Sequence, residues 1–275
     1  MILEIKNLSV SFFNLSEVSA PLVRAVRGVN ILLAEGSFTS LVGESGSGKS
    51  VTALSVCRLI RPHEISGEIY FYSKKGKKNL LVLSEAGLLE VRGSQIAYVF
   101  QDSASSLNPV MRVGEQIKEA YETHFKTTDA AARKRTLEVL EAVRMKDVER
   151  VYHSFPHQLS GGMRQRAMIA MALISEPRLL VADEPTTALD VSTEAEIMDL
   201  LLDLQRSRSL TVLFITHNLS LAAFASQFIY VMEKGCVVEG MKKEADGFRP
   251  RELYTTKLFN AQLGEHIKPK SLIEI

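Results

Sequence analysis

A glycine-rich segment at residues 43–50 carries the clearest chemistry in the sequence. It reads GESGSGKS and matches the phosphate-binding pattern G-x-x-x-x-G-K-[ST], between an expected strand and an expected helix. Its glycines let the backbone curl so that successive N–H groups point toward one anion, and the following helix N-terminus adds partial positive charge. Lys49 adds a full charge for the β- and γ-phosphates, and the Ser50 hydroxyl is a ligand for Mg²⁺. The predicted nucleotide contacts are Gly43, Glu44, Ser45, Gly46, Ser47, Gly48, Lys49 and Ser50.

Two adjacent acids follow an apolar run further along the chain. Residues 179–182 read LLVA, and Asp183 and Glu184 come next. Acids at the carboxyl end of a strand lie where α/β proteins bind ligands. Alone, the pair is equally typical of a solvated loop. In a chain that also carries a phosphate-binding loop, we expect Asp183 to hold Mg²⁺, directly or through water, and Glu184 to orient and deprotonate an attacking water.

Three single residues gain interest once a nucleotide is expected. Gln101 follows a predicted strand, and its amide is placed to reach Mg²⁺ or the attacking water. His217 follows another strand and is a candidate donor to a γ-phosphate oxygen. Phe12, at the end of the first strand, offers an aromatic face for a purine. Taken singly, each of the three is also consistent with core packing or an ordinary surface position.

A second candidate anion site lies at residues 159–163, which read LSGGM. Ser160 is a good helix N-cap, and Gly161 and Gly162 expose backbone N–H groups at the start of the expected helix. A helix start alone explains these residue types equally well. Two anion sites in one chain are unexpected if the chain binds a single nucleotide.

The elements that must position these residues follow from hydrophobic periodicity. Strands alternating with helices predict a mainly parallel sheet covered on both faces. Residues 14–21 are expected to form a polar loop, 74–78 a basic turn and 234–235 a second turn. We expect strands at 3–12, 23–33, 38–42, 67–72, 96–100, 179–182, 210–216, 228–232 and 237–238, and helices at 50–60, 162–174 and 193–205.

Residues 111–151 differ in character from the rest of the chain. They are rich in Ala, Glu, Lys, Arg and Leu, and apolar residues recur at helical spacing. The predicted fold is therefore α/β: a phosphate-loop core with a mainly parallel sheet, an N-terminal antiparallel β subdomain and an inserted α-helical subdomain. The predicted boundaries are 1–102 with 160–240 for the core, 103–159 for the helical subdomain and 241–275 for a partly helical tail.

Composition narrows the class of protein further. The chain has 275 residues, with 33 basic and 32 acidic side chains and a net charge of +1, which argues against nucleic-acid binding by bulk electrostatics. No run approaches 18 apolar residues, and the first residues do not form a signal peptide. Cys57 and Cys236 are in no metal-binding spacing. These features predict a cytosolic protein with two reduced thiols.

Taken together, the motifs resemble those of the ATP-binding-cassette (ABC) ATPases, over residues 3 to about 240. The family pairs two ATPase domains head to tail, which would explain the second anion site. The resemblance implies that Ser160, Gly161 and Gly162 contact the γ-phosphate of the partner's ATP and that Asp190 lies at the dimer interface. The motifs occur in the family's order: Phe12, GESGSGKS at 43–50, Gln101, LSGGM at 159–163, VADEP at 181–185, ALD at 188–190 and His217.

A narrower resemblance is to the ABC subfamily that powers import of dipeptides, oligopeptides or nickel. It covers residues 100–119, 159–170, 182–191 and 252–259, with Leu253 where the subfamily usually has proline. Many relatives carry tyrosine at the position of Phe12, and Phe13 is a second candidate for stacking on adenine. The resemblance favours peptide as cargo, with nickel as the alternative.

The resemblance implies an ATP- and Mg²⁺-dependent ATPase that drives uptake of di- or oligopeptides. Its expected partners are a second ABC ATPase subunit, identical or paralogous, two transmembrane permease subunits and, indirectly, an extracytoplasmic substrate-binding protein, with no nucleic acid. It would lie peripherally on the cytoplasmic face of the inner membrane. The segment after Gln101 and the helical insertion would dock the permease. A soluble, non-transport ABC ATPase is the less favoured alternative.

Overall fold

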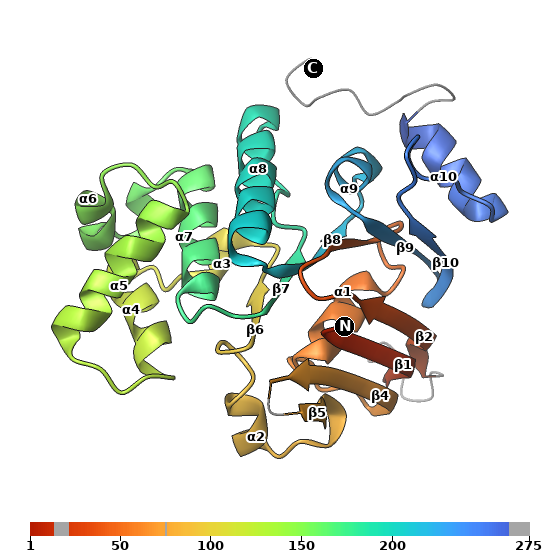
Figure 1. Ribbon diagram of the computed structural model, residues 1–275, viewed down its shortest axis with the longest axis horizontal. Coiled ribbons are helices and arrows are strands. Elements are labelled where there is room, and N and C mark those ends of the chain that lie inside the picture. Colours follow the sequence, from red (N-terminus) through yellow and green to blue (C-terminus); the bar gives the residue numbers. More distant parts are fainter. Residues whose placement is uncertain (14–21, 75, 264–275) are drawn as a thin grey trace. The chain divides into compact units, whose positions relative to one another are not determined.

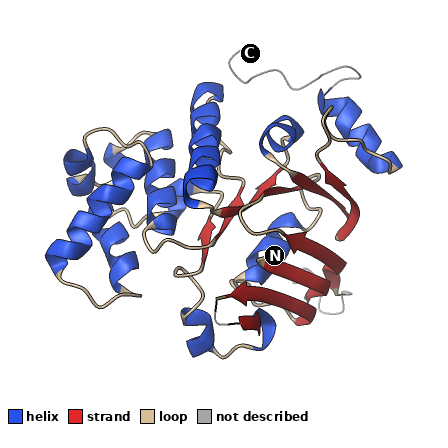
Figure 2. Ribbon diagram, viewed as in Figure 1, coloured by secondary structure: helices blue, strands red, loops and turns tan. Residues whose placement is uncertain are grey.

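The computed structural model describes residues 1–13, 22–74 and 76–263. The chain divides into two compact units, Met1–Leu88 with Thr211–Ile275 and Leu89–Leu210, and each is described by itself. Figure 1 labels the elements, and Figure 2 separates helices from strands. The predicted polar loop at 14–21 lies outside the described residues.

An antiparallel sheet fills one part of the first unit. Its strands are β1 (Leu3–Phe12), β2 (Val23–Leu33), β4 (Glu64–Ser73) and β5 (Gly76–Asn79), in the order β2-β1-β4-β5. Apolar side chains of β1 are buried because alternate residues face the core. The alternation is interrupted at Asn7, whose φ is +48°, and the register with β2 shifts between Ile5 and Leu8.

Parallel strands form the second sheet of this unit. Strand β3 (Phe38–Val42) lies between β8 (Thr211–Thr216) and β9 (Phe228–Glu233), parallel to both, and β10 (Cys236–Lys242) runs antiparallel to β9. Every residue of β3 and β8 is buried, as expected for parallel strands covered on both faces. The remaining elements of this part of the chain are α1 (Lys49–Val56), η1 (Leu80–Val82), α2 (Glu85–Leu89), α9 (Leu219–Ala225) and α10 (Leu253–Leu263).

The second unit combines two parallel strands with a group of helices. Strand β6 (Ile96–Val99) pairs in parallel with β7 (Leu179–Asp183). Helix α4 packs against α5, α6 and α7. Thr128 and Asp147 cap the first turns of α5 and α6 by accepting backbone N–H bonds. The helices are α3 (Ser103–Ser106), α4 (Val113–Glu122), α5 (Asp129–Ala142), α6 (Val148–His153), η2 (Pro156–Gln158), α7 (Gly161–Leu173) and α8 (Val191–Arg208).

The predicted fold class is confirmed: the protein is mixed α/β, with parallel strands, an antiparallel N-terminal sheet and helices between residues 103 and 159. Some element boundaries differ. Helix α1 ends at Val56, before the expected residue 60, because Arg58 has a φ of +49°. The expected basic turn is partly strand β5, and β10 is longer than the two residues expected. The predicted domain boundaries stay a prediction.

No helix among the described residues 1–13, 22–74 and 76–263 is long and apolar enough to cross a bilayer.

Candidate functional site

The backbone of the phosphate-binding loop has no room for side chains at two of its glycines. Gly43 has a φ of +151°, and a Cβ there would lie 2.2 Å from the Met232 carbonyl oxygen. Gly48 has a φ of +102°, and its Cβ would lie 2.5 Å from the Ala25 carbonyl oxygen. Both positions therefore require glycine because of conformation and close approach. The turn between β9 and β10 also holds the loop, because the Gly235 N–H donates to the Ser47 carbonyl at 2.9 Å.

Lys49 is the first residue of α1 and is only 4% exposed. Its ammonium donates to the carbonyl oxygens of Gly43 and Glu44, each at 2.9 Å, which draws the loop around the charge. The Ser47 hydroxyl is buried and has no hydrogen-bond partner among the described residues. A buried cation, a buried hydroxyl without a partner and a helix N-terminus together fit an anionic phosphate group. Ser50 is half-buried in the first turn of α1, and its role as a Mg²⁺ ligand stays a prediction.

His217 shares a strand end with this loop. Val42 pairs with Thr216 in the parallel β3–β8 ladder, so Gly43 and His217 each follow one member of the same pair. His217 is exposed. The Thr216 hydroxyl accepts a hydrogen bond from the Asn218 N–H at 3.0 Å, which fixes the turn after the strand. The structure thus brings His217 to the edge of the sheet at which the phosphate loop begins.

The two candidate aromatic residues differ in environment. Phe12 is half-buried as the last residue of β1 and pairs with Val23 across the sheet. Phe13 is 60% exposed, and its ring centroid lies 3.7 Å from that of His63. The contact with His63 had no signal in the sequence, since 50 positions separate the two residues. Which ring stacks on a base stays a prediction.

In the second unit, Asp183 ends β7 and is 6% exposed. Its carboxylate accepts a hydrogen bond from the Tyr98 hydroxyl at 2.8 Å. Tyr98 lies on the neighbouring strand β6, where it pairs with Val181. The sequence did not single out Tyr98, because a tyrosine inside a strand has no distinctive spacing. The tyrosine fixes one oxygen of the predicted Mg²⁺ ligand.

Glu184 adopts a φ of +44°, a conformation that is uncommon for glutamate and concentrates at functional sites. Its Oε2 accepts hydrogen bonds from the Gln101 side-chain amide at 3.1 Å and from the Thr187 hydroxyl at 2.9 Å. The structure therefore joins Gln101 to Glu184, two residues that the sequence proposed separately. Thr187 is a further contact, missed because nothing in the sequence distinguishes it from Thr186.

The LSGGM segment at residues 159–163, the signature segment, lies beside Asp190 within the second unit. Ser160 caps α7 by accepting a hydrogen bond from the Met163 N–H at 3.3 Å. A Cβ on Gly162 would lie 2.6 Å from Cγ2 of Thr193, so only glycine fits there. The Thr193 N–H and hydroxyl both donate to the Asp190 carboxylate, at 3.0 and 2.8 Å. Hydrogen bonds from the Ser192 hydroxyl and then Thr193 hold the pKa of Asp190 well below its usual range.

The predicted residues thus fall into three groups, and the members of each group lie within one unit. The phosphate loop and His217 lie together in the first unit. Gln101 and Glu184 are hydrogen-bonded in the second unit, where Asp183 directly precedes Glu184. The signature segment and Asp190 form the third group, in the same second unit.

A glycine-rich phosphate loop after one parallel strand, and two acids after another, define the class of phosphate-loop ATP-binding proteins. Comparison with known proteins gives the family. Residues 26–187, more than half of the chain, match the family described as ABC transporter. The chain belongs to this family and is one of its ATP-binding ATPases.

Curated relatives and a solved structure resemble the chain over most of its length. A probable peptide ABC transporter ATP-binding protein, y4tR of Sinorhizobium fredii, is 45% identical over 95% of this chain and 76% of its own. The oligopeptide transport ATP-binding protein OppD of Bacillus subtilis is 44% identical over 92% of this chain and 70% of its own. The ATP-binding cassette MJ0796, solved as a dimer in a post-hydrolysis state with ADP and Pi, superposes with a TM-score of 0.75 at 31% identity, over 88% of this chain and 98% of its own.

Proposed function

We propose that the chain is the ATP-hydrolysing subunit of an importer of di- and oligopeptides. The observation that carries the proposal is the 44–45% identity, over more than nine-tenths of this chain, to relatives named for peptide and oligopeptide transport. The names of these relatives favour peptide over the nickel alternative. In this function the chain transports nothing itself, and its ATPase cycle drives membrane permease subunits.

Mg²⁺ and ATP are the proposed cofactors, and the predicted residues of each unit suit them chemically. Mg²⁺ prefers hard oxygen ligands, and the Ser50 hydroxyl and the Asp183 carboxylate are such ligands. When bound, Mg²⁺ neutralises charge on the phosphates and orients them. Lys49 and the loop N–H groups bind the β- and γ-phosphates, and Phe12 or Phe13 stacks on adenine. Tyr98 orients Asp183 through the 2.8 Å hydrogen bond.

Glu184 is proposed as the general base of hydrolysis. It accepts a proton from the water that attacks the γ-phosphate, and its hydrogen bonds to Gln101 and Thr187 fix the carboxylate before the water arrives. Gln101 contacts Mg²⁺ or the attacking water through its amide. His217 donates to a γ-phosphate oxygen, where negative charge must be stabilised during the transfer.

A second ATPase subunit is proposed to complete the site. Ser160, Gly161 and Gly162 of one copy contact the γ-phosphate of the ATP held by the other, and Asp190 lies at the interface between copies. The capped start of α7 supports this role, because the first N–H groups of a helix have no acceptor within the helix and suit an anion. The Thr193 contact that excludes a side chain at Gly162 ties the signature segment to Asp190.

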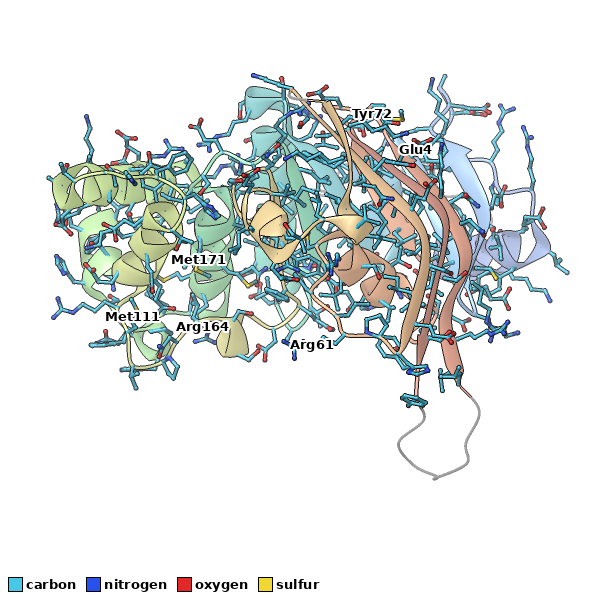
Figure 3. All side chains as sticks on the ribbon, turned by 90° about the horizontal axis from the view of Figure 1, so that it is seen from below. Glu4, Arg61, Tyr72, Met111, Arg164 and Met171 are labelled. Atoms are coloured by element: carbon cyan, nitrogen blue, oxygen red, sulfur yellow. The ribbon has the colours of Figure 1, made fainter. Side chains whose placement is uncertain are left out.

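Permease docking is proposed on an apolar groove of the second unit, which holds the protein peripherally on the cytoplasmic face of the membrane. The groove has a volume of about 480 Å³. Its lining includes residues of β6 and the segment after it, of α4 and of α7. The sequence predicted docking on the segment after Gln101 and the helical insertion, so the residues of α7 extend that prediction. The lining includes Phe100, Ala120, His124, Met168 and Met171, the last of which is labelled in Figure 3.

The function is tested by transport with the complete importer. The chain is co-expressed with its permease subunits and binding protein, reconstituted in proteoliposomes, and supplied with ATP and radiolabelled dipeptides, oligopeptides or ⁶³Ni²⁺. We expect peptide uptake that depends on ATP and is lost with Lys49→Ala. Uptake of nickel in place of peptide would contradict the proposed peptide cargo. Hydrolysis without transport of either would favour a non-transport ATPase.

A further inference from the structure

The C-terminal helix α10 packs on the part of the first unit that bears the phosphate loop and His217. It contacts α9 and β10, and Figure 1 labels the three elements. Phe259, 7% exposed, belongs to an apolar cluster that contains Val42 and Leu219. Val42 directly precedes the loop glycine Gly43, and Leu219 follows His217 by two residues. The apolar cluster that includes Phe259 of α10 thus also includes a residue next to the phosphate loop and a residue next to the His217 segment.

A hydrogen bond joins the last described turn of α10 to the segment after His217. The side-chain oxygen of Gln262 accepts from the Leu219 N–H at 3.0 Å, across 43 positions of sequence. Leu219 is the first residue of α9, whose initial N–H groups have no partner within the helix. Asn218 caps a different one, the Leu221 N–H, at 3.3 Å. Gln262 therefore supplies an acceptor that α9 does not find locally.

Two further contacts hold α10 in place. At its start, the Glu239 carboxylate on β10 accepts hydrogen bonds from the N–H groups of Arg251 and Glu252, at 2.8 and 3.2 Å. Near its first turn, the buried hydroxyl of Tyr254 lies close to the backbone of Glu44 in the phosphate loop, without regular hydrogen-bond geometry. Burial raises the pKa of Tyr254. The start of α10 is thus bonded to β10 and lies near the phosphate loop.

We infer that Gln262 is a positioning residue of the ATPase, through which α10 braces the segment that carries His217. The inference rests on the proposed role of His217 at the γ-phosphate. Gln262 touches no reacting group. It fixes the Leu219 backbone, and through the short link of Asn218 it limits the positions that the imidazole adopts. Without this bond the segment retains its α9 cap and its apolar packing against α10, but the Leu219 N–H loses its acceptor.

The test uses the full chain and three substitutions on one helix. Gln262→Ala removes the acceptor, Gln262→Glu keeps a side-chain oxygen in the same place, and Lys257→Ala alters an exposed residue of α10 as a matched control. We expect Gln262→Ala to lower kcat about five-fold, the usual effect of one lost hydrogen bond, with the KM for ATP changed less than two-fold. Gln262→Glu restores kcat to within two-fold, and Lys257→Ala leaves it unchanged.

Hydrogen–deuterium exchange of residues 213–222 separates this inference from the proposed function. We expect faster exchange in Gln262→Ala alone, with a thermal midpoint lowered by no more than about 4 °C. An unchanged exchange rate in Gln262→Ala would show that Gln262 does not hold the segment that carries His217, even if the protein proved inactive. Faster exchange with an unchanged kcat would overturn positioning. A wild-type chain that binds but never hydrolyses ATP would contradict the proposed function, while exchange would still decide whether Gln262 holds the segment.

Discussion

At the scale of single residues, the Glu184 carboxylate is held by neutral donors. Gln101 and Thr187 both donate to its Oε2, at 3.1 and 2.9 Å. A glutamine at this position keeps an oxygen for both donors and nearly the same shape. It lacks the basic oxygen that accepts a proton from water. Glu184→Gln therefore removes the group that accepts the proton and keeps the hydrogen bonds that hold the side chain in place.

We expect Glu184→Gln to lower ATP hydrolysis by at least 10²-fold, the usual contribution of a general base. ATP binding should be retained because the phosphate loop is untouched, and the ATP-bound dimer should persist since hydrolysis no longer ends it. Phosphate release and size-exclusion chromatography with light scattering measure both properties. The matched control is Glu122→Gln, an exposed glutamate on α4, which should hydrolyse ATP normally. Normal turnover in Glu184→Gln would remove Glu184 from the proposed role.

A site residue could be predicted from the sequence when its evidence lies in one contiguous motif. Lys49 and Ser50 belong to one contiguous motif whose backbone requirements can be read from the glycines, and the structure places them as expected. Tyr98 and Thr187 act through contacts made only when the chain is folded, and neither has a motif of its own. Sequence therefore predicts groups that would touch the nucleotide better than the groups that orient them.

At the scale of elements, the helices between residues 103 and 159 were also predictable from local sequence, whereas the contacts between them were not. Helical periodicity predicted their presence, but not the contact that sets how α4 and α6 approach. Gly114 in the first turn of α4 lies against the ring of Tyr152 on α6, and a Cβ on Gly114 would lie 2.2 Å from that ring. Tyr152 is 2% exposed, and its hydroxyl donates to Glu115 at 2.6 Å. The ring is therefore unable to move aside without losing that bond.

We expect Gly114→Ala to destabilise the protein by about 1–3 kcal/mol, as overpacking usually does, although alanine favours helix over glycine by about 1 kcal/mol. Urea unfolding followed by circular dichroism measures the free energy. Gly87→Ala is the matched control, since its Cβ would meet only side-chain atoms at 3.4 Å or more. That variant should be as stable as wild type or slightly more so. Equal stabilities of the two variants would contradict the packing described for Tyr152.

At the scale of the whole molecule, the proposed function requires that ATP hydrolysis be coupled to a permease without the permease touching the ATP. The apolar groove of the second unit offers a separate surface for this purpose. It includes Phe100, which directly precedes Gln101, so a partner seated there would lie beside a residue that contacts the proposed base. Met168 and Met171 line it with flexible side chains suited to packing against an apolar segment.

A charge in this groove should separate ATP hydrolysis from peptide transport, because it should weaken permease binding and leave hydrolysis intact. Met171 is half-buried on α7, and it has no role in the proposed nucleotide site. Met171→Glu would place a carboxylate against an apolar partner, where burial without a compensating bond costs more than about 1.4 kcal/mol, or a tenfold loss of affinity. We expect co-purification with the permease subunits to fall at least ten-fold, and peptide uptake to fall with it.

The matched variant Met171→Leu keeps the apolar volume and should retain both binding and transport. In the absence of permease, Met171→Glu should hydrolyse ATP within two-fold of wild type and melt at the same temperature, because a half-exposed carboxylate on the free protein remains hydrated. Retention of the permease by Met171→Glu would exclude the groove as the docking surface. Loss of intrinsic hydrolysis in that variant would instead show that the groove supports the nucleotide site, since the charge would then act without any partner present.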